Sequence, residues 1–112
     1  KILNIISDSG QGSPLAVLKL FGPENENYLS FPMEGFTLAL DFINQPALFP
    51  LLDELDKIVL EYEGRVYLAK DARIKEKNFE SGYAKIKEFR RLRHQDNLEI
   101  KFQSHQSRRL GL

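Results

Sequence analysis

The chain has 112 residues, so it is one domain or a part of one, and 42% hydrophobic residues are enough for a core. Sixteen basic and sixteen acidic side chains cancel, which argues against nucleic acid as a partner. The absence of cysteine excludes disulfides, thiolate metal sites and a cysteine nucleophile, and fits a reducing, cytoplasmic compartment. No apolar run approaches the ~20 residues of a membrane span, so membrane contact is expected only at the periphery.

The N-terminal third predicts a helix, a strand and a long loop. Residues 1–6 have apolar side chains at helical spacing without a preceding cap, which is typical of the second half of a helix in a longer protein. Leu15–Phe21 is a predicted strand, closed by Gly22 and Pro23. Residues 24–33 are polar and irregular, and are long for a tight hairpin. We therefore expect a functional loop or a lid there.

The central third predicts a strand followed by an amphipathic helix. Phe36–Phe42 alternates between large apolar residues at even positions and smaller or polar residues at odd ones. A helix is predicted from Asn44 to Gly64, with Pro46 in its first turn and Gly64 just past its end. Its apolar residues recur at helical spacing. They are Leu48, Leu51, Leu52, Leu55, Ile58, Val59 and Tyr62.

The C-terminal third predicts a third strand at Val66–Ala69, a helix at Ser81–His94 and a strand-like piece within residues 101–112. Phe79 leads into that helix. Its expected buried side consists of Tyr83, Ile86, Phe89 and Leu92. The order α-β-β-α-β-α predicts an α+β fold, with an antiparallel sheet and helices packed on one face.

Such packing leaves a second sheet face of distinctive composition. Thr37 and Ala39 are small residues in mid-strand, where larger ones are usual. On the neighbouring strand the same face carries Lys19, between apolar residues. The face is therefore either the floor of a pocket or an ordinary solvent-exposed surface. Its predicted members are Leu15, Val17, Lys19, Phe21, Thr37, Ala39 and Asp41.

A cluster of charges follows the predicted third strand. Lys70, Asp71 and Arg73 are either a solvated ion-pair cluster or a site in which the strand aims a lysine at a ligand. No other catalytic template is present, since the chain has no Gly-rich phosphate loop and no nucleophile elbow. His94 and His105 lack metal-ligand spacing and a third ligand, so surface positions and no metal are expected.

Several short motifs together resemble the C-terminal part of FAD-linked oxidases of the vanillyl-alcohol oxidase superfamily. Within it, the resemblance is greatest to oxidases of polyprenyl-phosphate-linked ribose, which serve cell-wall arabinan synthesis; sugar-1,4-lactone oxidases are more distant. The resemblance covers nearly the whole chain. The motifs are Val17–Gly22, Leu29–Met33, Asp41–Phe42, Gly64–Asp71 and Arg108–Leu110.

The resemblance implies roles for individual residues. Lys70 matches the catalytic lysine close to substrate and flavin, and Tyr67 and Ala69 match FAD contacts. Lys19 matches a second pocket lysine, suited to a polar or phosphate group. The remaining substrate-binding positions match Leu15, Val17, Phe21, Thr37 and Ala39.

The resemblance also implies a domain organisation. Residues 1–64 match a portion of the substrate, or cap, domain, and residues 65–112 match a segment that returns toward the FAD-binding domain. That domain would lie upstream and hold most of the FAD. Ala39 stands where the family pattern has a cysteine, and Thr37 and Ala16 stand where it has asparagines. We therefore expect a less polar pocket, closed to thiol-reactive inhibitors.

Two functions follow as expectations. The first is a fragment of an FAD-dependent oxidoreductase that oxidises a secondary alcohol of a small-molecule or lipid-linked sugar, or of an alditol, by hydride transfer to flavin. The isolated fragment would be inactive. The alternative is a stand-alone ligand-binding or interaction module without catalysis.

Overall fold

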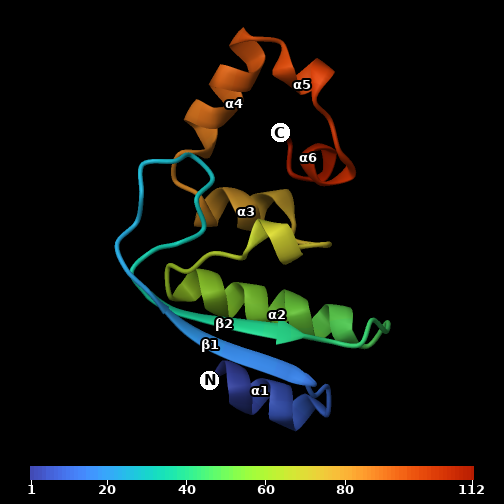
Figure 1. Ribbon diagram of the computed structural model, residues 1–112. Helices are drawn as coiled ribbons and strands as arrows, with labels where there is room; N and C mark the ends of the chain where they lie inside the picture. Colours follow the sequence, from blue (N-terminus) through green and yellow to red (C-terminus); the bar gives the residue numbers. More distant parts are fainter. The chain divides into compact units, whose positions relative to one another are not determined.

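The computed structural model describes all 112 residues. They form two compact units, one of residues 1–25 and 32–58, the other of residues 26–31 and 59–112. The elements are α1 (Ile2–Ser9), β1 (Leu15–Phe21), β2 (Gly35–Asp41), α2 (Leu48–Glu61), the 3₁₀ helix η1 (Leu68–Lys70), α3 (Glu76–Gly82), α4 (Ile86–Gln95), α5 (Leu98–Lys101) and α6 (His105–Arg109) (Figure 1). The predicted α+β class with an antiparallel sheet is confirmed. None of these helices has both the length and the apolar character needed to cross a membrane.

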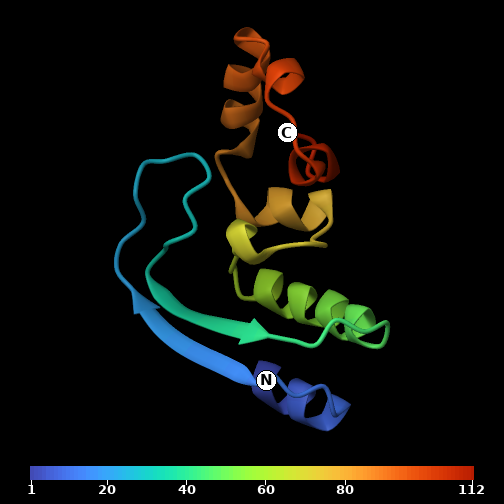
Figure 2. The same ribbon diagram turned by 45° about the vertical axis from the view of Figure 1, so that its right-hand side comes forward.

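The first unit contains the hairpin that the alternation predicts. β1 and β2 are antiparallel neighbours in a two-stranded sheet, and residues 22–34 connect them (Figure 2). Leu40 and Phe42 are partly buried against the core of this unit, as expected for the even-numbered face of the second strand. Phe36 lies on the same face but is 75% exposed, so the expectation that the whole even-numbered face meets the helix is wrong. Helical cover extends only over the Leu40 end of the hairpin.

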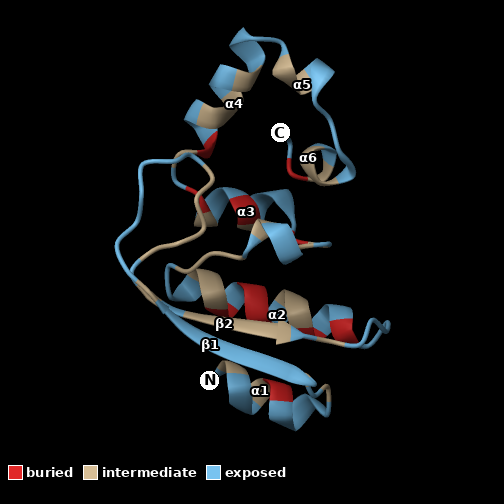
Figure 3. Ribbon diagram, in the orientation of Figure 1, coloured by how far each residue is buried: buried red, intermediate tan, exposed pale blue.

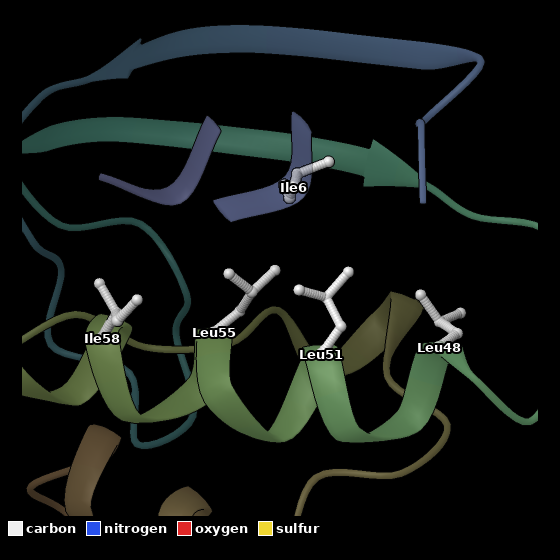
Figure 4. Close-up of a cluster of buried hydrophobic side chains, with 5 residues drawn as sticks. All are labelled: Ile6, Leu48, Leu51, Leu55 and Ile58. Carbon is white, nitrogen blue, oxygen red and sulfur yellow. The ribbon is translucent and has the colours of Figure 1, made fainter. Parts of the chain in front are cut away.

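The core of the first unit lies along the predicted stripe of α2. Buried residues recur along one side of the helix (Figure 3). Four α2 side chains, Leu48, Leu51, Leu55 and Ile58, point toward Ile6 of α1 (Figure 4). Burial of each such side chain stabilises the fold by about 1.5–3 kcal/mol before the entropy cost of folding. The stripe predicts the inner side of α2, except that Tyr62 is exposed and that Asp56, which lies off the stripe, is buried.

The end of α2 differs in detail from the prediction. Glu63 adopts the left-handed conformation, with φ of 56°. The Gly64 N–H then donates to the Val59 carbonyl over 2.8 Å. Gly64 thus follows the residue that takes the strained conformation, although a glycine would adopt that conformation more easily.

The second unit is helical, and two strand predictions are wrong there. Val66–Ala69 forms no strand: η1 occupies Leu68–Lys70, and side chains from later elements bond its carbonyl groups in place of a neighbouring strand. The strand-like piece within residues 101–112 is instead the end of α5, a loop and α6. The predicted order α-β-β-α-β-α is therefore corrected to a single hairpin, with one helix before it and α2, η1 and four further helices after it.

The predicted helix over Ser81–His94 is interrupted. α3 ends at Gly82, Tyr83 is extended, and α4 starts at Ile86. Gly82, the last residue of α3, lies against Arg65: a Cβ on Gly82 would lie 3.0 Å from Arg65 Cβ and 3.3 Å from Arg65 Cα. Glycine permits this close approach. The interruption lets Tyr83 and Ile86 enter one core together with Ile74, Phe79 and Leu110, whereas Leu92, expected in the buried side, is exposed.

Candidate active site

The hairpin brings the predicted substrate-binding residues onto one face. In an antiparallel pair, directly opposite residues project to the same side. Lys19 lies opposite Thr37, and Val17 lies opposite Ala39. Leu15 pairs with Asp41 and Phe21 with Gly35, so all seven predicted members share this face.

This face is partly exposed. Lys19 is exposed, as are Leu15 and Val17, while Phe21, Thr37 and Ala39 are half-buried. The α2 core instead contacts Leu40 and Phe42, which project to the opposite face. Only the Leu40 and Phe42 end of that opposite face meets the core, since Leu18, Leu20 and Phe36 are exposed, so the predicted contrast between a helix-covered face and an open face is only partly observed. A role for the Lys19 face in substrate binding stays a prediction.

Tyr67, Ala69 and Lys70 form the second group of predicted site residues. They lie together at η1, where the Lys70 N–H donates to the Tyr67 carbonyl over 3.3 Å. The Tyr67 ring contacts the Phe31 ring, and the two ring centroids are 4.8 Å apart. Tyr67 is nevertheless 46% exposed, and Ala69 and Lys70 are exposed. All three side chains are therefore accessible to a ligand within this unit.

Side chains distant in sequence fix the backbone on which these residues lie. The Tyr83 hydroxyl donates to the Val66 carbonyl over 2.8 Å. The Gln106 amide donates to the Leu68 carbonyl over 2.7 Å. Burial, as the main cause, raises the pKa of Tyr83 to about 12, so its hydroxyl keeps the donated proton at neutral pH. These two bonds tie the backbone at Val66 and Leu68 to side chains far along the chain.

The Asp71 carboxylate makes three hydrogen bonds that fix the end of this segment. Its Oδ1 atom accepts the N–H groups of Arg73, over 2.8 Å, and of Ile74, over 2.7 Å. Its Oδ2 atom accepts a guanidinium N–H of Arg109 over 2.6 Å. The Asp71 side chain is only 2% exposed. The alternative of a solvated ion-pair cluster is therefore wrong for Asp71.

The ionisation of Asp71 follows from these contacts. Burial is the largest single influence and would by itself raise the pKa of this carboxyl. The hydrogen bonds from Ile74 and Arg109 lead the opposing influences, and the pKa is lowered below its ordinary value. The group is consequently a carboxylate in the folded chain at neutral pH. It stabilises the fold only while it is charged.

We expect Asp71→Asn to destabilise the chain at pH 7 by about 1.5–3 kcal/mol, as for hydrogen bonds to a charged group. Because the folded-state pKa is lowered, this contribution is present above the unfolded-state pKa of about 4 and is lost as the pH falls through the lower folded-state value. Urea unfolding at several pH values between 7 and 3 measures the difference from wild type, which should shrink below about pH 4. Asp96→Asn, at an exposed position after α4, is the control. A difference that stays constant down to pH 3 would contradict the assignment.

Some residues of the site give little sign in the sequence. Gln106 carries no motif, and Tyr83 is predicted only as a core residue. Arg109 lies within one of the motifs of the resemblance, Arg108–Leu110, which suggests no role for it. As expected, the two histidines are exposed, and His94 Nδ1 lies 3.0 Å from Glu99 Oε1. No group of three or more His, Asp or Glu side chains in the chain could hold a metal ion.

The two groups of predicted site residues belong to different units. The Lys19 face lies in the first unit, and η1 lies in the second. Their convergence on one pocket stays a prediction, as does the assignment of residues 1–64 and 65–112 to a substrate domain and a flavin-facing segment.

No protein-family model matches the chain. It is 42% identical over 107 residues to decaprenylphosphoryl-β-D-ribose oxidase of Mycolicibacterium smegmatis, which covers 96% of this chain and 23% of that protein. It is also 37% identical over 108 residues to an uncharacterised protein in the mprA 5′ region of Streptomyces coelicolor, covering 96% of this chain and 29% of that protein. The chain thus spans about a quarter of the length of these curated relatives. The similarity extends over almost all of the residues described above, including the hairpin and η1. The resemblance predicted from the motifs is therefore confirmed: the chain is similar to the C-terminal part of decaprenylphosphoryl-β-D-ribose oxidase.

Proposed function

We propose that the chain is part of an FAD-dependent oxidoreductase that oxidises a secondary alcohol of a sugar or alditol to a ketone. One observation carries the proposal: an exposed lysine, Lys70, lies on an anchored turn in a chain that is 42% identical to a named oxidase. An exposed lysine alone is common on protein surfaces. Fixed backbone on both sides of Lys70 distinguishes it from an ordinary surface residue.

The residues of η1 suit contact with a flavin. Tyr67 offers an exposed aromatic ring that Phe31 supports from one side. Ala69 is small and exposed, so a planar ring system can approach the backbone there. Lys70 supplies a positive charge, which suits a group that becomes negative when it is reduced. We infer that these three residues contact the flavin and that a separate part of the protein holds most of it.

A bound flavin would supply the two-electron acceptor for oxidation of the alcohol, in which the carbon would give a hydride to the flavin and the hydroxyl oxygen would release its proton to solvent. The chain's own residues would bind and orient the substrate. The Lys70 ammonium would orient the reacting hydroxyl. Lys19 would bind a phosphate or another polar group, since an exposed ammonium is well suited to an anion. Apolar contacts would come from Leu15, Val17 and Phe21, and Thr37 and Ala39 would face the substrate from the neighbouring strand.

The substrate proposed in finer detail is ribose linked through phosphate to a polyprenyl chain. The oxidase from M. smegmatis is named for decaprenylphosphoryl-β-D-ribose. The Lys19 face offers the matching combination of one cation and exposed apolar side chains on neighbouring positions of β1. A phosphate and a prenyl chain require just these two kinds of contact.

The test uses the full-length protein under anaerobic conditions. We expect the purified protein to be yellow, and a polyprenyl-phosphate ribose to bleach its visible flavin absorbance within one turnover. The isolated 112-residue chain should be colourless, because we assign most of the flavin contacts to another part of the protein. A full-length protein without flavin would refute the proposal. Bleaching by a sugar-1,4-lactone alone would retain the reaction class and replace the substrate.

A further inference from the structure

The turn that carries Lys70 is followed at once by a buried charge. Asp71 is the next residue, and its carboxylate makes three hydrogen bonds while its side chain is only 2% exposed. A residue bound so tightly has little freedom in its backbone. Lys70 is joined to it by a single peptide bond. The hydrogen-bond partners of Asp71 therefore also determine the backbone conformation at Lys70.

Arg109, at the end of α6, bonds Asp71, although the two residues are 38 positions apart in the chain. One terminal nitrogen of its guanidinium donates to Asp71 Oδ2 over 2.6 Å, and the other donates to the Ile74 carbonyl. One planar group thus binds two acceptors three positions apart in the chain. Charge-assisted bonds of this kind are short, strong and geometrically specific. Lysine has the charge but cannot reproduce both bonds in one plane.

The position of Arg109 is itself fixed. A capping box between Ser104 and Ser107 closes the N-terminal end of α6. Leu110, the residue after Arg109, is completely buried in the core of the second unit. From the same helix, Gln106 bonds the Leu68 carbonyl two residues before Lys70. Helix α6 therefore contacts the chain on both sides of the lysine, through Gln106 before it and Arg109 after it.

We infer that Arg109 is a positioning residue for Lys70 and acts through the Asp71 carboxylate. It does not need to touch substrate or flavin. It removes conformations in which the ammonium of Lys70 points elsewhere, and it neutralises the buried carboxylate beside the site. The inference depends on the role of Lys70 put forward under the proposed function.

The first experiment is a double-mutant cycle in the full-length protein, read as the rate of flavin reduction in a single anaerobic turnover. Arg109→Ala should slow reduction about 10- to 100-fold in the wild-type background, because displacement of a catalytic group by about 1 Å costs this much. In the Lys70→Ala background the same change should have no further effect. Arg108→Ala is the matched control, since the Arg108 side chain is exposed and bonds the side chain of Gln103.

A second measurement requires no flavin. Lysines of the full-length protein are labelled by reductive ¹³C-methylation, and the Lys70 signal is assigned by its loss in Lys70→Arg. Arg109→Ala should shift this signal toward that of a mobile lysine and sharpen it, whereas Arg108→Ala should leave it unchanged. If Arg109→Ala does not fold, Arg109→Lys keeps the charge and one bond, and should shift the signal in the same direction by a smaller amount.

The outcomes distinguish a failure of the proposed role of Lys70 from a failure of the proposed role of Arg109. If Lys70→Ala has no effect on flavin reduction, the proposed function of Lys70 fails, whatever Arg109 does. If Lys70→Ala slows reduction but Arg109→Ala causes an equal loss in both backgrounds, Arg109 is only structural and the inference fails. An unchanged Lys70 signal in a folded Arg109 variant also overturns it.

Discussion

Lys70→Ala is expected to reduce turnover of the full-length protein by roughly 10²–10³-fold or more while the fold is retained, the loss typical of one pre-positioned electrostatic group. The side chain is exposed, and Tyr83, Gln106 and Arg109 fix its segment by hydrogen bonds to the Val66 carbonyl, the Leu68 carbonyl and the Asp71 carboxylate. Its removal therefore takes away charge and orientation at the reacting hydroxyl without opening the core. Steady-state kinetics tests the loss of turnover, and circular dichroism of the same samples tests whether the fold is retained.

Two comparisons define the role of Lys70 further. Lys70→Arg keeps the positive charge but changes its shape and reach, so it should recover only part of the lost rate. Lys77→Ala removes an exposed lysine from α3 of the same unit and should leave turnover unchanged. Normal turnover in the Lys70→Ala protein would exclude Lys70 from the mechanism.

Phe79→Ala is expected to destabilise the second unit by about 3–5 kcal/mol, the range for truncation of a buried aromatic residue. Phe79 is 0% exposed and contacts Tyr83, with ring centroids 5.1 Å apart. Tyr83 in turn bonds Val66, so loss of the ring should also loosen the turn that carries Lys70. Urea unfolding followed by circular dichroism measures the change. Amide hydrogen exchange over residues 66–74 should also be faster than in the wild type, because the turn is loosened.

The chain offers a matched control for this prediction. Phe36 has the same side chain but is 75% exposed. Phe36→Ala should therefore change the free energy of unfolding by no more than about 0.5 kcal/mol, as is usual for a surface substitution. Equal effects of the two substitutions would mean that Phe79 does not lie in the core described above.

The sequence predicts the hairpin and α2 well because each has a strict period. Alternation over residues 36–42 assigns the two faces of β2, and pairing with β1 extends the assignment to Lys19. Spacing of three and four residues identifies the inner side of α2. In both elements the repeat itself marks the buried side, even though α2 packs on Ile6 of the distant helix α1, so local pattern and tertiary structure agree.

The second unit is harder to predict, because its structure depends on contacts between distant residues. A short apolar run such as Val66–Ala69 fits a strand or a buried turn equally well. Here Tyr83, 17 residues later, and Gln106, 38 residues after Leu68, bond its carbonyl groups. The pairing of Asp71 with Arg109 likewise spans 38 residues. In the sequence, Asp71 looks like part of a local charge cluster, and nothing near it indicates its true partner.

The wide separation of Asp71 and Arg109 also sets an order of events during synthesis. Ribosomes add about 5–20 residues per second, so Arg109 is translated roughly 2–8 s after Asp71. The hairpin, whose strands both precede residue 42, has all of its pairing partners by then. A polypeptide that terminates prematurely between residues 71 and 109 would consequently carry a complete hairpin and the lysine, but never the arginine that secures it.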